Sequence, residues 1–351
     1  MDIEHVEVYY EPGRYGGWPA NHGIWSWGDE ILVGFTRGYY KDRGPHHHID
    51  PDRPTESGLA RSLDGGRTWT LEHPNQQGYL MPFGGDRPGT QRAADPPDCP
   101  GGIRFTHPDF AMTLRASNAH GSTGAARLSY SYDRGKTWEG PFRFPNLGTP
   151  GIGARTDYIV NGESDCLVFL TAAKSNGYEG RPFCARTADG GATWRFVSWI
   201  GPEPEGFAIM PATVRTTGSE LVTVIRRSEG RRRWNCAYVS PDDGETWIPL
   251  DDPVADQGGG NPPSLIKLAD GRLCLTYGWR GERSRMCAKT SADRGRSWSP
   301  EIVLRDDGAG GDMGYPRSVQ RPDGRAVTIY YFTDAHRPER YIAVTIWEPP
   351  A

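Results

Sequence analysis

The sequence predicts an all-β fold, and three observations support this prediction. The 351 residues include 46 Gly, 30 Pro, 12 Trp and 16 Tyr, a composition that suits many short strands joined by tight turns. One eight-residue phrase occurs five times, as SLDGGRTW from Ser62, SYDRGKTW from Ser131, TADGGATW from Thr187, SPDDGETW from Ser240 and SADRGRSW from Ser291. The phrases are almost evenly spaced, because their first aspartates lie 69, 56, 53 and 51 residues apart, at Asp64, Asp133, Asp189, Asp242 and Asp293.

The spacing and the chemistry of the phrase predict a β-propeller. A period near 50 residues matches one four-stranded blade, because a blade needs four strands of about five residues and their turns. The glycine of the phrase supplies the positive φ of a tight hairpin, and its Asp and Ser/Thr side chains can bond to the turn's own backbone. The trailing Trp returns to the sheet and buries its ring. We therefore expect the five aspartates to be structural.

Taken in chain order, the hairpins of first and second strands predict six blades. These hairpins are expected at 23–35, 101–117, 158–170, 214–225, 265–277 and 318–331. The last blade lacks the phrase, and the N-terminal strand IEHVEVYYE (3–11) is expected to pair with RYIAVTIWEPP (340–350) and so close the ring. The prediction is a six-bladed β-propeller of four-stranded antiparallel blades, formed as one domain by residues 1–351.

Charge and hydropathy exclude several classes of partner. The formal net charge is −4, with 40 basic and 44 acidic residues spread along the chain, so we expect no nucleic-acid partner. The sequence has no apolar run of about 18 residues for a membrane span. The start MDIEHVEVYYEPG lacks the features of a signal peptide, which predicts a cytoplasmic protein, or a secreted one if a signal peptide has been removed.

Neither cysteines nor histidines predict a metal or another cofactor. The six cysteines form no C-x-x-C pair, and Cys236 and Cys287 each lie four residues before the serine of a phrase, as expected of small core residues. The run PHHHID (45–50) contains three consecutive histidines, but adjacent residues of an extended segment alternate sides and cannot all face one ion. We expect a flexible loop there.

Blade geometry predicts where functional residues gather. If the phrases join strands three and four on one face, the opposite face carries the starts of the inner strands and the loops between strands two and three. The inner-strand starts contribute Trp18, Asn21, His22, Arg155, Glu205, Asn261, Asp312, Tyr315 and Arg317. The loops contribute Arg37, Asp42, Arg226, Arg227, Arg280 and Asp334. This mixture suits an acidic sugar, because guanidinium groups bind carboxylates, rings stack on a pyranose and carboxylates transfer protons.

The repeated phrase resembles the Asp-box, or BNR repeat, of the sialidase superfamily. In those families the motif lies on the propeller face away from the active site, and it accompanies different functions. The resemblance implies a tyrosine nucleophile, a glutamate that takes its proton, an aspartate as acid/base and three arginines for the substrate carboxylate. By position these roles correspond here to Tyr315, Glu205 and Asp42, with Arg226 or Arg227 as one arginine.

Two arginine positions depart from the sialidase pattern. The first-blade motif is Gly17-Trp18-Pro19, without an Arg, and the fifth blade starts with Asn261-Pro262-Pro263. Arg317, Arg155 or Arg37 could substitute from elsewhere. The expected function is therefore a sialidase-like exo-glycosidase that acts on an acidic or related sugar at the non-reducing end of a glycan, rather than a true sialidase.

Two other functions remain open. Some similar Asp-box propellers are uronate-directed polysaccharide lyases, in which arginine neutralises the uronate and His22 or Tyr315 would remove the neighbouring proton. The other function is non-catalytic glycan binding, in which affinity is spread over aromatic and arginine residues without turnover. Large rate losses on substitution of Tyr315 or His22 would distinguish an enzyme. The irregular stretch 74–102 could rim the mouth and bring Arg87 and Arg92 to the substrate.

Overall fold

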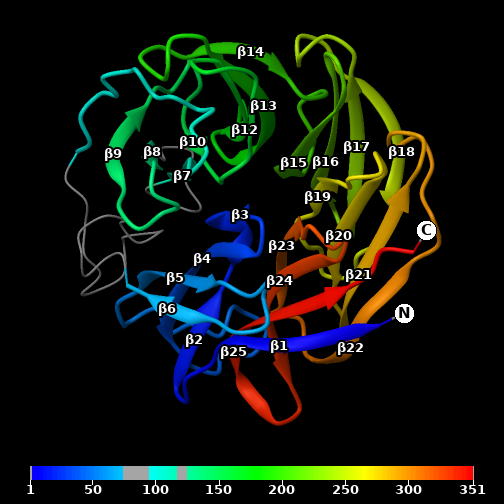
Figure 1. Ribbon diagram of the computed structural model, residues 1–351. Coiled ribbons are helices and arrows are strands. Elements are labelled where there is room, and N and C mark those ends of the chain that lie inside the picture. Colours follow the sequence, from blue (N-terminus) through cyan, green and yellow to red (C-terminus); the bar gives the residue numbers. More distant parts are fainter. Residues whose placement is uncertain (1, 74–94, 117–124, 351) are drawn as a thin grey trace.

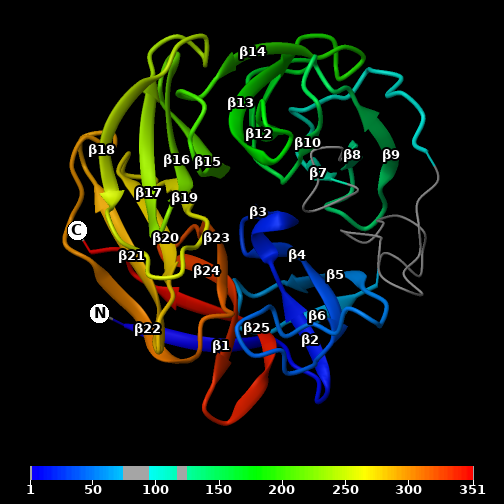
Figure 2. The ribbon, with the colours of Figure 1, turned by 180° about the vertical axis from the view of Figure 1, so that it is seen from behind.

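The computed structural model describes residues 2–73, 95–116 and 125–350, and strands dominate this part of the chain. The strands form sheets arranged around a common axis, as Figures 1 and 2 show from opposite sides. The described residues include one short helix, η1 (Pro19–Asn21), which is a single 3₁₀ turn. None of their helices is long and apolar enough to cross a membrane. The predicted all-β propeller is confirmed.

Four separate sheets follow one another along the first two thirds of the chain. The first contains β2 (Arg14–Gly17), β3 (Ile24–Trp27), β4 (Glu30–Tyr39), β5 (Glu56–Ser62) and β6 (Thr70–Glu72). The second contains β7 (Ala111–Ala116), β8 (Ala126–Ser131) and β9 (Glu139–Phe144). The third contains β10 (Ile152–Gly153), β11 (Tyr158–Val160), β12 (Cys166–Ala173), β13 (Glu179–Thr187) and β14 (Arg195–Trp199). The fourth contains β15 (Phe207–Thr217), β16 (Glu220–Glu229), β17 (Arg232–Ser240) and β18 (Ile248–Val254).

The remaining strands form one continuous sheet of eight. It contains β19 (Ser264–Lys267), β20 (Leu273–Trp279), β21 (Arg283–Ser291), β22 (Ile302–Ala309), β23 (Gly314–Gln320), β24 (Ala326–Asp334), β25 (Arg337–Trp347) and β1 (Ile3–Tyr9). A single pair, Gly308 with Asp334, links β22 to β24, so the sheet consists of two antiparallel groups of four strands.

The N-terminal strand closes the ring as predicted. β1 pairs antiparallel with β25, from Ile3 opposite Trp347 to Tyr9 opposite Ile342. The first and last strands of the chain therefore share one sheet, and Figure 1 shows β1 beside β25. This pairing covers an edge of β25 that would otherwise expose unpaired backbone groups.

The hairpin expected at 101–117 does not form. Only Ala111–Ala116 is a strand, and its partner is β8, the next strand along the chain. The preceding residues turn twice, since His107 N donates to Arg104 O and Phe110 N donates to His107 O. Phe105 and Phe110 are buried and lie 5.6 Å apart between ring centroids. Their apolar character reflects burial of a loop rather than an inner strand.

The five phrases form turns that share the Ser/Thr and Asp hydrogen bonds, whereas the tryptophan bond to the Gly carbonyl is made in the first two. In the first, Ser62 Oγ accepts from Gly66 N (2.8 Å), Asp64 Oδ1 accepts from Thr68 N (2.9 Å) and Trp69 Nε1 donates to Gly66 O (2.8 Å). Although burial opposes it, these bonds and the Thr68 hydroxyl lower the pKa of Asp64 to about 2. The corresponding aspartates of the other turns also accept from the backbone N of the Thr or Ser four residues later. The predicted structural role of the aspartates agrees with these contacts.

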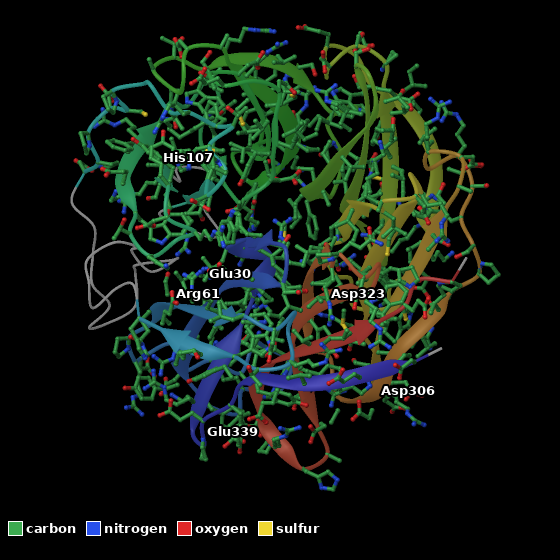
Figure 3. All side chains as sticks on the ribbon, in the orientation of Figure 1. Glu30, Arg61, His107, Asp306, Asp323 and Glu339 are labelled. Carbon is green, nitrogen blue, oxygen red and sulfur yellow. The ribbon has the colours of Figure 1, made fainter. Side chains whose placement is uncertain are left out.

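Backbone contacts place these turns on one face of the ring. Gly65 N donates to Asp29 O (2.9 Å), and Asp243 N donates to Ser219 O (2.9 Å), so turns between strands one and two lie against turns between strands three and four. Neighbouring sheets are also held together there. Glu30 accepts from Arg61 (2.7 Å) and from Arg134 of the next sheet (2.7 Å), and Figure 3 shows Glu30 beside Arg61.

The cysteines lie in the core as free thiols. Five are buried, Cys99 is half-buried, and all six are free. Cys236 in β17 and Cys287 in β21 are both buried, as expected from their equivalent positions in the repeat.

Candidate active site

A cavity of about 1210 Å³ opens on the face opposite the repeated turns. In the first sheet, the cavity reaches Thr55 at the start of β5, whereas the turn lies beyond Ser62 at the other end of the same strand. Its lining comes from inner-strand starts and from the loops that join strands two and three. These are Trp18, Asn21, Arg155, Asp312 and Tyr315, with Tyr40, residues 43–49, Arg280 and Asp334 from the loops. The cavity thus lies where blade geometry predicts it.

Tyr315 is the predicted nucleophile, and it lines this cavity. It has a positive φ of 52° at a bulge where the pairing of β23 with β24 shifts between Gly314 and Arg317. Such a bulge re-aims a side chain at the end of a strand. Tyr315 N donates to Asn261 Oδ1 (2.7 Å), which holds the unusual backbone in place. The phenol oxygen accepts from Arg226 Nη1 at 3.1 Å.

Three guanidinium groups surround the phenol. The Arg280 and Arg226 guanidinium carbons lie 5.5 and 5.9 Å from the centroid of the Tyr315 ring. Although burial opposes it, the positive charges of Arg226, Arg280 and Arg155 lower the pKa of Tyr315. The arrangement therefore makes the phenolate, the nucleophilic or basic form, easier to form than in a free tyrosine.

Two of the three arginines, Arg155 and Arg280, are also held by other groups. Arg155 forms an ion pair with Glu179, and its Nε donates to Asn21 Oδ1 (3.1 Å). Arg280 Nη2 donates to Met313 O (2.7 Å) and to the Tyr331 hydroxyl (2.9 Å). Glu179 pairs with Arg155 and the Asp312 carboxylate acts on Arg280, so three guanidinium groups face two carboxylates and positive charge exceeds negative charge around Tyr315.

Asp312 forms a second charged centre in the cavity. Its Oδ1 accepts from Tyr331 OH (2.8 Å) and lies 2.6 Å from His47 Nδ1. Its Oδ2 accepts from His48 N (2.9 Å) and lies 3.3 Å from Arg340 Nε. Although burial opposes it, His47, Arg340 and the His48 N–H hold the pKa of Asp312 far below its usual range. Asp312 is therefore an anion.

The histidine loop, for which the sequence predicted flexibility and no metal site, contributes to the cavity wall. His46, His47 and His48 all line the cavity, and backbone bonds from Lys41 N to His48 O (2.9 Å) and from Asp50 N to Tyr39 O (2.8 Å) fix the loop. The sequence did not indicate that Asp312, which also lines the cavity, would bind His47 and the backbone N–H of His48 in this loop. Among the described residues, no group of histidines, cysteines and carboxylates could hold a metal ion.

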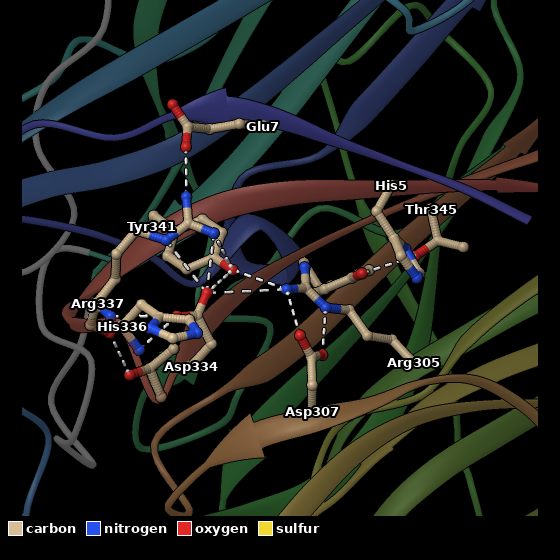
Figure 4. Close-up of polar contacts among 11 residues, drawn as sticks. His5, Glu7, Arg305, Asp307, Asp334, His336, Arg337, Tyr341 and Thr345 are labelled. Atoms are coloured by element: carbon tan, nitrogen blue, oxygen red, sulfur yellow. Dashed lines mark hydrogen bonds and ion pairs between the residues drawn. The ribbon is translucent and has the colours of Figure 1, made fainter.

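Asp334 is a buried carboxylate at the edge of the cavity. It accepts from Tyr341 OH (2.7 Å), Arg337 Nη2 (2.8 Å) and His336 N (2.9 Å), as Figure 4 shows for the surrounding cluster. Although burial opposes it, these donors lower the pKa of Asp334 to about 2. It is fully engaged as an anion and has no proton to transfer near neutral pH.

Two predicted catalytic carboxylates are not brought to the cavity. The Asp42 side chain is 77% exposed and turns back on its own loop, where Oδ1 accepts from Gly44 N (3.1 Å). Glu205 is exposed, and its backbone carbonyl accepts from Lys174 Nζ (3.0 Å). Both residues lie in loops, where position in the sequence does not fix the direction of a side chain.

Two predicted arginines also point elsewhere. Arg37 pairs with Glu56 (2.8 Å) and Glu11 (3.2 Å). Arg227 follows Arg226 on β16 and therefore faces the other side of the sheet, where its guanidinium lies 5.3 Å from the Trp234 ring centroid. Neither lines the cavity.

His22, Asn261 and Arg317 lie beneath the cavity rather than in its lining. His22 is fully buried with Nε2 2.9 Å from Thr36 Oγ1, and burial, with Arg115, holds its pKa well below the usual value. Asn261 is fully buried and supports the Tyr315 backbone. Arg317 Nη2 donates to Ala20 O (2.9 Å). These residues position the inner strands.

Seven predicted residues therefore line the cavity, and one more contacts a lining residue through a hydrogen bond. The seven are Trp18, Asn21, Arg155, Arg280, Asp312, Tyr315 and Asp334, and the eighth is Arg226. Arg87 and Arg92 lie outside the described residues.

Comparisons with known proteins agree with this fold. A family described as a BNR repeat-like domain matches residues 168–329. A protein of unknown function from Dyadobacter fermentans is 20% identical with a TM-score of 0.74, and the similarity covers 99% of each chain. The NanB sialidase of Streptococcus pneumoniae is 11% identical with a TM-score of 0.64, covering 98% of this chain and 70% of that one.

An enzyme of different specificity is equally similar. The α-L-arabinofuranosidase of Fusarium graminearum is 13% identical with a TM-score of 0.62, covering 98% of this chain and 97% of that one. No curated protein sequence matches the chain. The BNR match covers a little under half of the chain, and the likeness to these solved structures shows the fold, which is a β-propeller.

Proposed function

We propose that the protein is a glycoside hydrolase that removes a terminal, carboxylate-bearing sugar from a glycan in the cavity described above. The observation that carries this proposal is the phenol of Tyr315, held by Arg226 and surrounded by Arg155 and Arg280 at the cavity wall. A cavity of about 1210 Å³ has room for a sugar and part of its aglycone. The solved structures of similar fold include glycosidases, which supports this class of substrate.

In this proposal Tyr315 attacks the anomeric carbon as the bond to the leaving oxygen breaks. Water then releases the sugar from the tyrosyl intermediate. The family resemblance assigned the activation of the tyrosine to Glu205, but that residue is exposed outside the cavity lining. The guanidinium groups take over this role by lowering the pKa of the phenol, and their excess positive charge attracts the substrate carboxylate.

The test is turnover of a panel of sialosides, rhamnosyl-glucuronides and uronate oligosaccharides, with released sugar as the readout. We expect Tyr315→Phe to lower kcat/KM by about 10³-fold or more, because it removes the attacking oxygen. Tyr40→Phe is a matched control, since it removes one hydroxyl from the same cavity and should retain activity. Full activity of Tyr315→Phe would refute the proposal.

A uronate-directed lyase is the second candidate, and the surroundings of Tyr315 favour it specifically. The phenol contacts a guanidinium, so a phenolate there could remove the proton next to a uronate whose carboxylate an arginine neutralises. An unsaturated uronate product, detected by its absorbance, would assign elimination rather than hydrolysis. Binding of a panel member without turnover would assign a glycan-binding propeller.

We also infer that the ring has six blades and that residues 1–351 form one domain. Counting the two four-stranded groups of the eight-stranded sheet separately adds two blades to the four other sheets. Pairing of β1 with β25 brings the two ends of the chain into a single ring, which supports one domain.

A further inference from the structure

His47 and Asp312 form an ordered pair in the cavity wall. The pair joins two distant parts of the chain, because His47 belongs to the loop after β4 and Asp312 precedes β23. His47 Nδ1 lies 2.6 Å from Asp312 Oδ1, and its ring packs edge-on against Trp18 with 5.1 Å between centroids. The imidazole is thus oriented by one hydrogen bond and one ring contact.

The geometry leaves the second nitrogen of His47 for the cavity. Because Nδ1 faces Asp312, Nε2 lies on the opposite side of the ring. No described residue forms a hydrogen bond with Nε2. His47 lines the cavity, and its side chain is 40% exposed. Nε2 can therefore meet an oxygen of a bound substrate.

Asp312 is built to support a charged imidazole. The carboxylate is 7% exposed and receives Tyr331 OH (2.8 Å), His48 N (2.9 Å) and Arg340 Nε (3.3 Å). These donors fix it as an anion, and an anion at Nδ1 stabilises the imidazolium and fixes its orientation.

The two carboxylates that line the cavity, Asp312 and Asp334, are anions and have no proton to give. Glu179 is paired with Arg155, and Asp42 is exposed outside the lining. Burial raises the pKa of Asp157 to about 7, but this residue is not part of the lining. Cleavage of an unactivated glycoside nevertheless requires a proton for the leaving oxygen.

The two neighbouring histidines are less suited to this task. Burial and then Arg340 lower the pKa of His48, so it is neutral near pH 7. The backbone N of His46 donates to Arg43 O, and its imidazole has no carboxylate partner among the described residues. His48 Nδ1 lies 3.3 Å from Asp42 Oδ1, but that carboxylate is exposed, so His47 is the one of the three histidines with a buried carboxylate partner.

We propose that His47 is the catalytic general acid/base of this site and that Asp312 is its positioning residue. This inference rests on the proposed function. The imidazolium gives its Nε2 proton to the leaving oxygen while that oxygen's bond to the anomeric carbon breaks and the Tyr315 phenolate bonds to the carbon. The neutral Nε2 then takes a proton from the attacking water, whose oxygen bonds to the anomeric carbon and releases the phenolate. The second step restores both residues.

Leaving-group chemistry tests the role of His47. The probes are dinitrophenyl and methyl glycosides of sialic acid and of glucuronic acid, used with whichever sugar the panel shows to be cleaved. Dinitrophenolate leaves without a proton, whereas methoxide needs one. We expect His47→Gln to lower kcat/KM for the methyl glycoside by about 10²–10⁴-fold and to change it less than about fivefold for the dinitrophenyl glycoside.

Further variants separate chemistry from structure. Tyr315→Phe should lose both substrates, and Asp42→Asn should lose neither, although it lies in the same loop as His47. In His47→Ala, added imidazole should restore turnover of the methyl glycoside, which a structural role would not allow. Asp312→Asn should lower kcat for the methyl glycoside more than for the dinitrophenyl glycoside. Thermal unfolding checks that each variant is folded.

The outcomes distinguish this inference from the proposed function. If His47→Gln retains methyl-glycoside turnover, or loses both substrates equally while folded, His47 is not the proton donor. In that case the loss of turnover in Tyr315→Phe would leave the proposed function standing. If the wild-type protein cleaves no member of the panel, the proposed function is wrong, and so is this inference.

Discussion

The hydroxyl of Tyr315 accepts its hydrogen bond from Arg226, a residue that the sequence placed at the site. Arg226 and Arg227 differ in the side of the sheet that they face, because successive side chains of a strand point to opposite sides. The sequence alone left the choice between the two open. The hydrogen-bond register of β16, in which Arg226 pairs with Asn235, decides it.

The cationic surroundings of Tyr315 predict a pH dependence. Since Arg226 lowers the pKa of Tyr315, the reactive phenolate forms, and kcat/KM rises, as pH increases through a value below 10. Arg226→Gln removes one positive charge, raises that pKa, and should move the rising limb of the pH profile to higher pH by about one unit.

Arg227→Gln is the matched control for this measurement, because it removes the same charge from the opposite side of β16. It should leave the limb in place. An unshifted limb in Arg226→Gln would show that another group controls the profile.

At the scale of elements, three inner-strand starts share one backbone feature. Trp18, Met210 and Tyr315 have positive φ values of 58°, 57° and 52°, although none is glycine. The pairing of β15 shifts between Ile209 and Ala212, and that of β23 shifts between Gly314 and Arg317. Strained backbone of this kind persists only where its surroundings hold it, and it often marks functional sites.

Gly314→Ala tests this element. Gly314 has a φ of +102°, and a Cβ there would collide with the Asn261 amide that holds Tyr315. We expect a loss of at least about 1 kcal/mol in the free energy of unfolding and a marked fall in activity. Gly324→Ala is the control, because its φ is +87° but its Cβ would meet nothing within 4 Å.

Urea unfolding and turnover separate the two effects. Both variants carry backbone strain, so the free energy of unfolding should fall in both. Turnover by the folded protein should fall only in Gly314→Ala. Equal activity in the two variants would show that the Asn261 contact does not position Tyr315.

At the scale of the molecule, the five phrases were enough to predict a propeller, because a turn that bonds to itself is fully specified by nearby residues. The pairing of the first strand with the last was also predicted, because an open ring would leave an exposed sheet edge. The apolar residues Phe105 and Phe110 led to the wrong prediction of a strand, because a buried loop also requires apolar residues. The sequence could not predict the direction of side chains in loops. Asp42 and His47 belong to one loop, yet Asp42 points into solvent and His47 lines the cavity.

Closure of the ring gives a prediction about stability. Deletion of residues 1–9 removes β1 and exposes the edge of β25. We expect Tm to fall by at least about 5 °C, together with concentration-dependent aggregation. Thermal unfolding with light scattering measures both, and Asp2→Asn, which keeps the strand, is the control. A stable monomer after the deletion would show that β1 is dispensable.

The register of that closing pair also determines how the ring responds to force. Ile3 lies opposite Trp347 while Tyr9 lies opposite Ile342, so both chain ends leave the pair from the same end. A pull between the two termini would load the hydrogen bonds one after another, as in a zipper, rather than all together in shear. The seam between first and last strands is therefore mechanically weak even though it completes the fold. An unfolding machine that engages either terminus would open the propeller there first.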